Sequence, residues 1–186
     1  MMEALASARR IGEGLDEDHL PYGIGGALAL GVWGAPRMTL DVDISVFVGP
    51  GDVVRVLDSL ERIGVMVKRD QAVRDIERVG FAKGRLGIVV VDVFISQHPQ
   101  FAAMAKRVRR IVDASGWSAA FISAEDLCLY KLVYYRDKDL VDLQHLFAAR
   151  TDLDTGYIRE WLGNMFPAGD PRLAMLDELE RRFLGA

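Results

Sequence analysis

Apolar residues follow helix and strand periods in turn along the first two thirds of the chain. Leu5, Ala8, Ile11 and Leu15 recur at helical spacing, whereas residues 40–48 are rich in β-branched side chains and end at a Gly-Pro-Gly turn. The run over residues 86–96 is apolar on both faces, which is typical of a strand in the middle of a sheet. The pattern predicts helices over residues 3–15, 27–33 and 53–63, and strands over residues 22–24, 40–48, 65–68, 78–82, 86–96 and, as a pair, within 109–122.

The last third of the chain changes to helical spacing throughout. The expected helices cover residues 124–135, 138–149, 155–165 and 171–184. We therefore expect an α/β core over residues 1–122, followed by a helical C-terminal subdomain over residues 123–186.

Composition fits an ordinary globular protein. Of the 186 residues, 51% are apolar and 27% are charged, enough for one sizeable domain or a core with a small appendage. The apolar stretches are too short to cross a bilayer, and the N-terminal segment lacks the apolar middle of a signal peptide. The single cysteine, Cys128, excludes an intramolecular disulfide, so we expect a cytoplasmic protein with a buried thiol.

The charge balance argues against a broad nucleic-acid footprint. The net charge is −4 at pH 7, and the densest basic segment is the short run KRVRR over residues 106–110. This run is either a local basic patch or, more simply, the charged edge of a strand that is protected from pairing with other chains.

Three aspartates stand out because they interrupt apolar strands. Asp41 and Asp43 are two residues apart, so their side chains leave the same face of a strand, and Asp92 lies inside the most apolar run. If they converged, each pair at ~4 Å would repel by about 4 kcal/mol at an effective dielectric constant near 20. Such a cluster must take up protons or recruit cations, and carboxylate oxygens with open positions suit Mg²⁺ that bridges to phosphate. The alternative is that Asp41 and Asp43 face solvent while Asp92 pairs with a buried arginine, such as Arg85 or Arg78.

A glycine pair favours the first alternative. Gly25 and Gly26 lie at a strand-to-helix junction, where backbone N–H groups and the helix N-terminus can receive phosphate. The Asp-x-Asp strand returns about fifteen residues later, one helix away. A phosphate cradle and a metal site would thus lie together.

These residues resemble the polymerase-β-like nucleotidyltransferase superfamily. Its signature is a Gly-Gly/Ser helix start, a hydrophobic-Asp-x-Asp-hydrophobic strand and a third acid on a later strand. The stretch GAPRMTLDVDI is similar to the form found in minimal bacterial members related to AbiEii/MenT-like toxins. Many relatives carry serine where this chain has Gly26, which cannot supply the hydroxyl contact to phosphate. A second block, ISAEDLCLYKLVYYRDKDLVDLQHL, resembles the family through residues such as Glu125, Lys131 and Asp139.

The resemblance implies a small mixed sheet flanked by helices and a Mg²⁺-dependent transfer. Asp41, Asp43 and Asp92 would be the catalytic residues and the metal ligands, for two Mg²⁺ ions or for Mn²⁺. Asp92 would serve the acceptor hydroxyl. The residues expected at the nucleotide, including ATP, are Gly25, Gly26, Arg37, Thr39, Lys131, Lys138 and Asp139. Two readings compete with these roles: Arg37 and Thr39 can instead orient Asp41 or cover a loop, and Lys138 can form an i, i+4 ion pair with Asp142.

The expected function is transfer of a nucleoside monophosphate from an NTP to a hydroxyl. The toxin-like relatives favour a tRNA 3′ end or a protein side chain as acceptor, and they imply an antitoxin partner. Alternatives are an aminoglycoside-type small-molecule acceptor, or a nucleotide-binding or protein-interaction module with little catalysis. A haloacid-dehalogenase-like phosphatase fits poorly, because Ala174 occupies the place of the acid expected four residues after Asp170.

Overall fold

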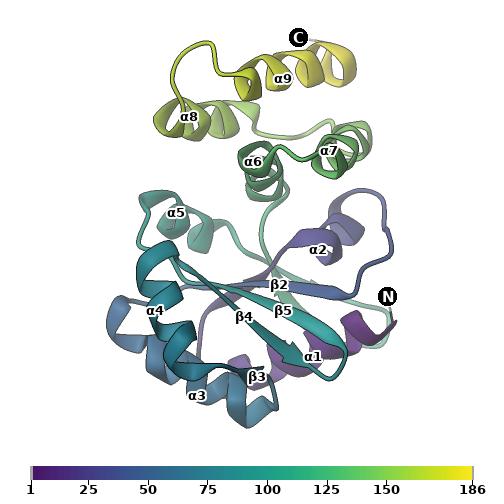
Figure 1. Cartoon of the computed structure of the whole chain (residues 1–186). Coiled ribbons are helices and arrows are strands. Elements are labelled where there is room, and N and C mark those ends of the chain that lie inside the picture. Colours follow the sequence, from purple (N-terminus) through teal and green to yellow (C-terminus); the bar gives the residue numbers. More distant parts are fainter. Residues whose placement is uncertain (1, 186) are drawn as a thin grey trace. The chain divides into compact units, whose positions relative to one another are not determined.

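The computed structural model describes residues 2–185 (Figure 1). Contacts divide the chain into two compact units, each described by itself. The first holds the residues up to 28 and residues 37–122, and the second holds residues 29–36 together with the residues from 123 onward. No helix within residues 2–185 combines the length and apolarity that crossing a bilayer requires.

A seven-stranded mixed sheet organises the first unit. Its strands, in chain order, are β1 Tyr22–Ile24, β2 Asp41–Val46, β3 Met66–Val67, β4 Phe81–Leu86, β5 Val89–Phe94, β6 Arg109–Val112 and β7 Ser118–Phe121. Their spatial order is β3-β4-β5-β2-β1-β7-β6, so β2 is central and β6 is an edge strand. β2 pairs in parallel with β5 and antiparallel with β1.

The β4–β5 hairpin has a two-residue turn. Leu86 pairs with Val89, and between them Gly87 adopts a φ of +61°, a backbone conformation that glycine accepts without strain. This turn sets which residues of β4 and β5 lie opposite each other.

Helices lie on both sides of the sheet, and three of them cover the face that forms the apolar core (Figure 1). The helices of this unit are α1 Met2–Glu17, α3 Val53–Ile63, α4 Arg69–Val79 and α5 Pro99–Arg107, and a 3₁₀ turn covers Pro50–Asp52. Helix α2 Gly26–Trp33 begins in this unit, and its residues from 29 onward belong to the second. Helices α1, α3 and α4 lie on the same side of the sheet (Figure 1). Their apolar side chains, such as Ile11 and Leu57, pack with Val42, Ile44 and Val91 into a core that excludes solvent.

The second unit is helical. It contains α6 Ala124–Tyr134, α7 Asp137–Ala149, α8 Thr155–Met165 and α9 Pro171–Leu179, and a π-helical turn over Glu180–Leu184 extends α9. Leu132, Leu143, Phe147 and Leu162 are fully buried in its core. Cys128 is also fully buried, and burial raises the pKa of its thiol, as expected of a core residue.

The predicted fold class is confirmed, with local corrections. The chain is a mixed sheet flanked by helices and followed by a helical segment. Helices α4 and α5 were not predicted, the strand expected over 78–82 begins at Phe81, and the single strand expected over 86–96 is the β5 arm of a hairpin. Helix α4 escapes the pattern because only Ala72 and Ile76 of its eleven residues are buried, which leaves it charged on most of its surface.

Candidate active site

The three predicted acids share one face of the sheet. Asp43 on β2 is the register partner of Asp92 on β5, and Asp41 precedes Asp43 by two residues on the same strand. Neighbouring strands lie about 4.8 Å apart, and residues opposite each other project to the same face. The parallel β2–β5 pairing therefore places Asp41, Asp43 and Asp92 on one face of the sheet.

The glycine pair adjoins the same residue from the other side. The Gly25 amide donates a hydrogen bond of 2.9 Å to the carbonyl of Asp43, and helix α2 begins at Gly26. Gly26 has a φ of +56°, and a Cβ atom added to it would lie 1.8 Å from Oδ2 of Asp43. Only glycine lets the helix start this close to the carboxylate.

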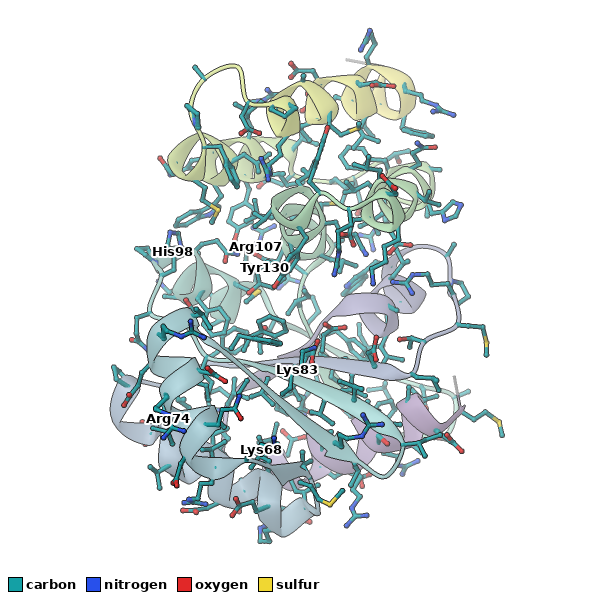
Figure 2. The ribbon with its side chains drawn as sticks, viewed as in Figure 1. Lys68, Arg74, Lys83, His98, Arg107 and Tyr130 are labelled. Carbon is teal, nitrogen blue, oxygen red and sulfur yellow. The ribbon has the colours of Figure 1, made fainter. Side chains whose placement is uncertain are left out.

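A lysine completes a row across four strands. Lys83 on β4 is the register partner of Asp92, and its Nζ lies 3.0 Å from Oδ1 and 3.2 Å from Oδ2 of that carboxylate (Figure 2). The row therefore runs Lys83, Asp92, Asp43, Gly25. The alternative partners weighed for Asp92 are wrong: Arg85 donates to the carbonyl of Ile88, and the structure pairs Arg78 with Asp75.

Two predicted residues, Arg37 and Thr39, lie just before β2 and form hydrogen bonds near its first residue. The amide of Asp41 donates a 3.1 Å hydrogen bond to the hydroxyl of Thr39, which fixes the backbone where the acidic strand begins. Arg37 donates a long bond of 3.4 Å to the neighbouring carbonyl of Met38. Thr39 thus orients Asp41, which is one of the two roles expected of it.

The row has the chemistry of a divalent-metal site. Three carboxylates on one face are hard oxygen donors of the kind Mg²⁺ prefers, and the carboxylate of Asp43 lies where a side chain of residue 26 would be. Among residues 2–185, however, no three acidic, histidine or cysteine side chains are grouped closely enough to hold an ion as they stand. Asp92 is held by Lys83 instead, so the residues fit the metal once Asp92 is released from that ion pair.

The second unit contains the other predicted nucleotide residues, and two of them belong to a buried ion network. Nζ of Lys131 lies 2.6 Å from Asp142 and 3.8 Å from Asp139, and all three side chains are at most 5% exposed. Arg136 binds Asp139 through Nε at 2.6 Å. Lys138 is exposed, and the structure pairs Asp142 with Lys131 rather than with Lys138.

The ionisation of Asp139 depends on this network. Burial by itself would raise the pKa of Asp139, but the hydrogen bonds and charge of Arg136 and the charge of Lys131 outweigh it and hold that pKa below its ordinary value. The pair Lys131–Asp142 is therefore part of a charged cluster that keeps α6 and α7 together.

A second network of buried hydrogen bonds involves Ser123 and Asp126, at the start of the segment ISAEDLCLYKLVYYRDKDLVDLQHL. The Asp126 amide donates a 3.1 Å bond to the Ser123 hydroxyl, which caps helix α6 and in turn donates to the Asp126 carboxylate at 2.6 Å. The hydroxyl of Tyr157 on α8 also donates to Asp126, at 2.7 Å. Asp126, which is fully buried, thus connects α6 with α8.

Lys83 is the residue of this site that sequence reasoning missed. The run Phe81 to Leu86 alternates apolar and polar residues and so indicates that Lys83 and Arg85 share one face. The partner of Lys83 depends on the register between β4 and β5, which the two-residue turn at Gly87 sets.

Comparisons with known proteins agree on a fold. No family model and no curated protein matches the sequence. Among solved structures, the antibiotic-resistance factor ANT(2″)-Ia is similar with a TM-score of 0.53 and 18% identity, over 97% of this chain and 92% of that one. A candidate nucleotidyltransferase from Thermotoga maritima gives 0.51 at 15% identity, over 88% of this chain and 95% of that one. An antigenic nucleotidyltransferase-like protein from Paracoccidioides brasiliensis gives 0.51 at 14% identity, over 95% and 93%. The chain therefore has a nucleotidyltransferase fold.

Proposed function

We propose that this protein is a metal-dependent nucleotidyltransferase that moves a nucleoside monophosphate from an NTP to an acceptor hydroxyl. The observation that supports it most is the row Lys83, Asp92, Asp43, Gly25, which lies across the centre of a sheet with the nucleotidyltransferase fold. The start of α2 lies on one side of Asp43, and Asp92 lies on the other.

The glycines and the acids of the row have different proposed roles. The amides at the start of α2, next to Gly25 and Gly26, would receive the phosphates of the NTP. Asp41, Asp43 and Asp92 would hold Mg²⁺, or Mn²⁺ in its place, and the bound metal would neutralise charge on the attacking and leaving oxygens. Arg37, Lys131, Lys138 and Asp139 stay predicted nucleotide residues.

The transfer itself needs one proton acceptor and one leaving group. The acceptor hydroxyl gives its proton to the carboxylate of Asp92 as its oxygen forms a bond to the α-phosphorus. The bond between the α-phosphorus and its bridging oxygen breaks, and pyrophosphate leaves. Asp43, next to the helix start, would act as a metal ligand and would not contact the phosphate itself, because a carboxylate repels the negative charge of the α-phosphate.

The proposed acceptor hydroxyl belongs to a tRNA 3′ end, a protein side chain or a small molecule. ANT(2″)-Ia has been crystallised with adenylyl-2″-tobramycin, and this supports the small-molecule class. A role as a toxin with an antitoxin partner stays a prediction, and it rests on the resemblance of the sequence to the toxin-like relatives.

A transfer assay with four labelled NTPs tests the proposal. Each α-³²P-labelled NTP is incubated with Mg²⁺ and, in turn, with total tRNA, cell lysate, the protein itself and an aminoglycoside. The control is the Asp41→Asn/Asp43→Asn variant, which retains the size of both side chains. Label transferred by the wild type and not by the control establishes the enzyme and its acceptor class. Binding of NTP without transfer to any acceptor would favour the non-catalytic binding module.

A further inference from the structure

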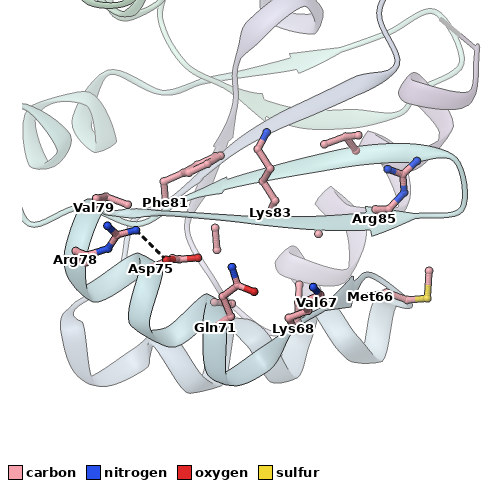
Figure 3. A pocket seen from close by; sticks show the side chains of 14 residues that line it. Met66, Val67, Lys68, Gln71, Asp75, Arg78, Val79, Phe81, Lys83 and Arg85 are labelled. Atoms are coloured by element: carbon pink, nitrogen blue, oxygen red, sulfur yellow. Dashed lines mark hydrogen bonds and ion pairs between the residues drawn. The ribbon is translucent and has the colours of Figure 1, made fainter.

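A groove follows the outer edge of β4, next to the third acid. It has a volume of about 750 Å³ and lies between β4, the short strand β3 and helix α4 (Figure 3). β3 pairs with only two residues of β4, Gly84 and Arg85, so the remaining edge of β4 is open to the groove. The size falls within the range of ligand-binding clefts.

The lining of this groove is basic in a protein that is acidic overall. Lys68, Arg78, Lys83 and Arg85 line it, against a single acid, Asp75. Residues 66–90 contain six basic and three acidic residues, a net charge of +3, whereas the whole chain carries −4. The positive charge is therefore concentrated at this edge of the sheet, where it attracts an anionic ligand.

Two of these cations are available to a ligand. Arg78 pairs with Asp75, and Lys83 pairs with Asp92. Neither Lys68 nor Arg85 forms an ion pair with another part of the chain that the structure describes. Apolar surface lies between the charges, since Met66 is 67% and Val79 56% exposed.

The groove is on the acceptor side of the proposed reaction. Gly25 and Gly26 are on the β1 side of Asp43, whereas the groove is on the β4 side of Asp92, beyond Lys83. Lys83 both lines the groove and binds the acid that serves the acceptor hydroxyl. An acceptor lying in the groove would thus reach Asp92 without crossing the nucleotide.

We propose that this groove binds the phosphate backbone of an RNA acceptor, with Lys68 and Arg85 as phosphate contacts. The proposal rests on the proposed nucleotidyl transfer and specifies its acceptor. Cations separated by apolar and aromatic surface, here including Phe81, suit single-stranded RNA, whose bases stack while its phosphates pair. A protein acceptor is the competing class, and the experiment separates the two.

The test compares two basic surfaces of equal charge. Binding of a fluorescein-labelled single-stranded RNA of about 12 nucleotides, a length within known site sizes, is followed by fluorescence anisotropy. The Lys68→Glu/Arg85→Glu variant reverses the groove charges. The Lys106→Glu/Arg109→Glu variant makes the same charge change in the KRVRR segment, where both residues are exposed.

We expect the groove variant to bind RNA at least about tenfold more weakly and the control to change little. Two lost phosphate contacts should also lower the slope of log affinity against log salt by about 1.4, measured between about 50 and 200 mM salt. Equal loss in both variants, or a larger loss in the control, would overturn the proposal.

A parallel measurement separates this proposal from the enzymatic one. Binding of labelled NTP with Mn²⁺ and transfer to a protein or a small hydroxyl acceptor are measured with the wild type. Transfer to such acceptors by a protein that does not bind RNA overturns the groove proposal and leaves the enzyme standing. Absence of both NTP binding and transfer overturns the proposed function as well.

Discussion

Replacing Lys83 by methionine should tighten divalent-metal binding. In the structure the ammonium group of Lys83 donates hydrogen bonds to both carboxylate oxygens of Asp92. A metal ion must therefore displace this ammonium group before Asp92 can coordinate the ion. Methionine retains most of the apolar stem and removes the ammonium group, including its contact with the ring of Phe81, whose centroid lies 5.2 Å from Nζ. Most substitutions of a charged residue near an active site weaken binding, which makes the expected direction diagnostic.

The magnitude follows from the exposure of the pair. The Lys83 side chain is 63% exposed and that of Asp92 is 18% exposed. An ion pair with one well-solvated partner contributes at most about 1 kcal/mol. Loss of that competition corresponds to about a fivefold lower dissociation constant for the metal. The same variant should lose about 1 kcal/mol of stability without metal, because Asp92 then faces Asp43 without the ammonium group that pairs with it.

Electron paramagnetic resonance of free Mn²⁺ measures the binding directly, without turnover. The matched control is Arg109→Met, which removes one positive charge from β6, at the edge of the sheet on the far side of β1 from β5. At about 0.1 M salt, charges separated by more than about 10 Å are largely screened, so this control should bind Mn²⁺ like the wild type. Equal or weaker Mn²⁺ binding by Lys83→Met would refute the claim that Lys83 and the metal compete for Asp92. Lys83 would then instead support binding of the ion or of the substrate.

Three further substitutions test the acids, the glycine and the buried lysine. Gly26→Ala should lower the free energy of unfolding by about 1–2 kcal/mol and reduce Mn²⁺ binding, since its Cβ would displace Asp43, whereas Gly31→Ala in the same helix should not destabilise. Asp43→Asn should abolish transfer yet leave thermal stability without metal unchanged or higher, because it removes repulsion, and a large drop would contradict the acidic row. Lys131→Met should cost about 3–5 kcal/mol in urea unfolding, because Asp142 stays buried and charged, and Lys131→Met/Asp142→Leu should recover part of it. A folded Lys131→Met protein that only binds NTP more weakly would instead support the predicted nucleotide role.

Helices and strands were predictable from the sequence where the spacing of apolar residues matches the buried face of the element. Ala8, Ile11 and Leu15 of the predicted α1 stripe are buried, although Leu5 is exposed, and the β-branched run of β2 is largely buried, so both elements were found close to their true bounds. Helix α5 has a short apolar pattern, but His98 accepts a hydrogen bond from the Gln100 amide and Pro99 occupies the first turn, which is a start signal that could have found it. Gly80 ends α4 with a φ of +70° and marks the same kind of missed boundary.

The candidate site was predictable only within single strands. The spacing of Asp41 and Asp43 puts them on one face whatever the fold, because successive side chains of a strand alternate. The approach of Asp92 to Asp43, and of Lys83 to Asp92, depends on pairing between residues that are 49 and 9 positions apart in the sequence. Periodicity contains no information on such register, so the counter-ion of Asp92 could not be identified from the chain alone.

The tight turn at Gly87 makes the length of the β4–β5 hairpin a condition of the chemistry. One residue inserted between Leu86 and Val89 leaves Lys83 opposite Asp92 only if it lengthens the loop, because a shift of β4 or β5 by one position moves every side chain of that strand to the other face. Such a shift of β5 would send Asp92 into the apolar core, and such a shift of β4 would send Lys83 there. Insertions at this turn should therefore retain the site only where Leu86 still pairs with Val89.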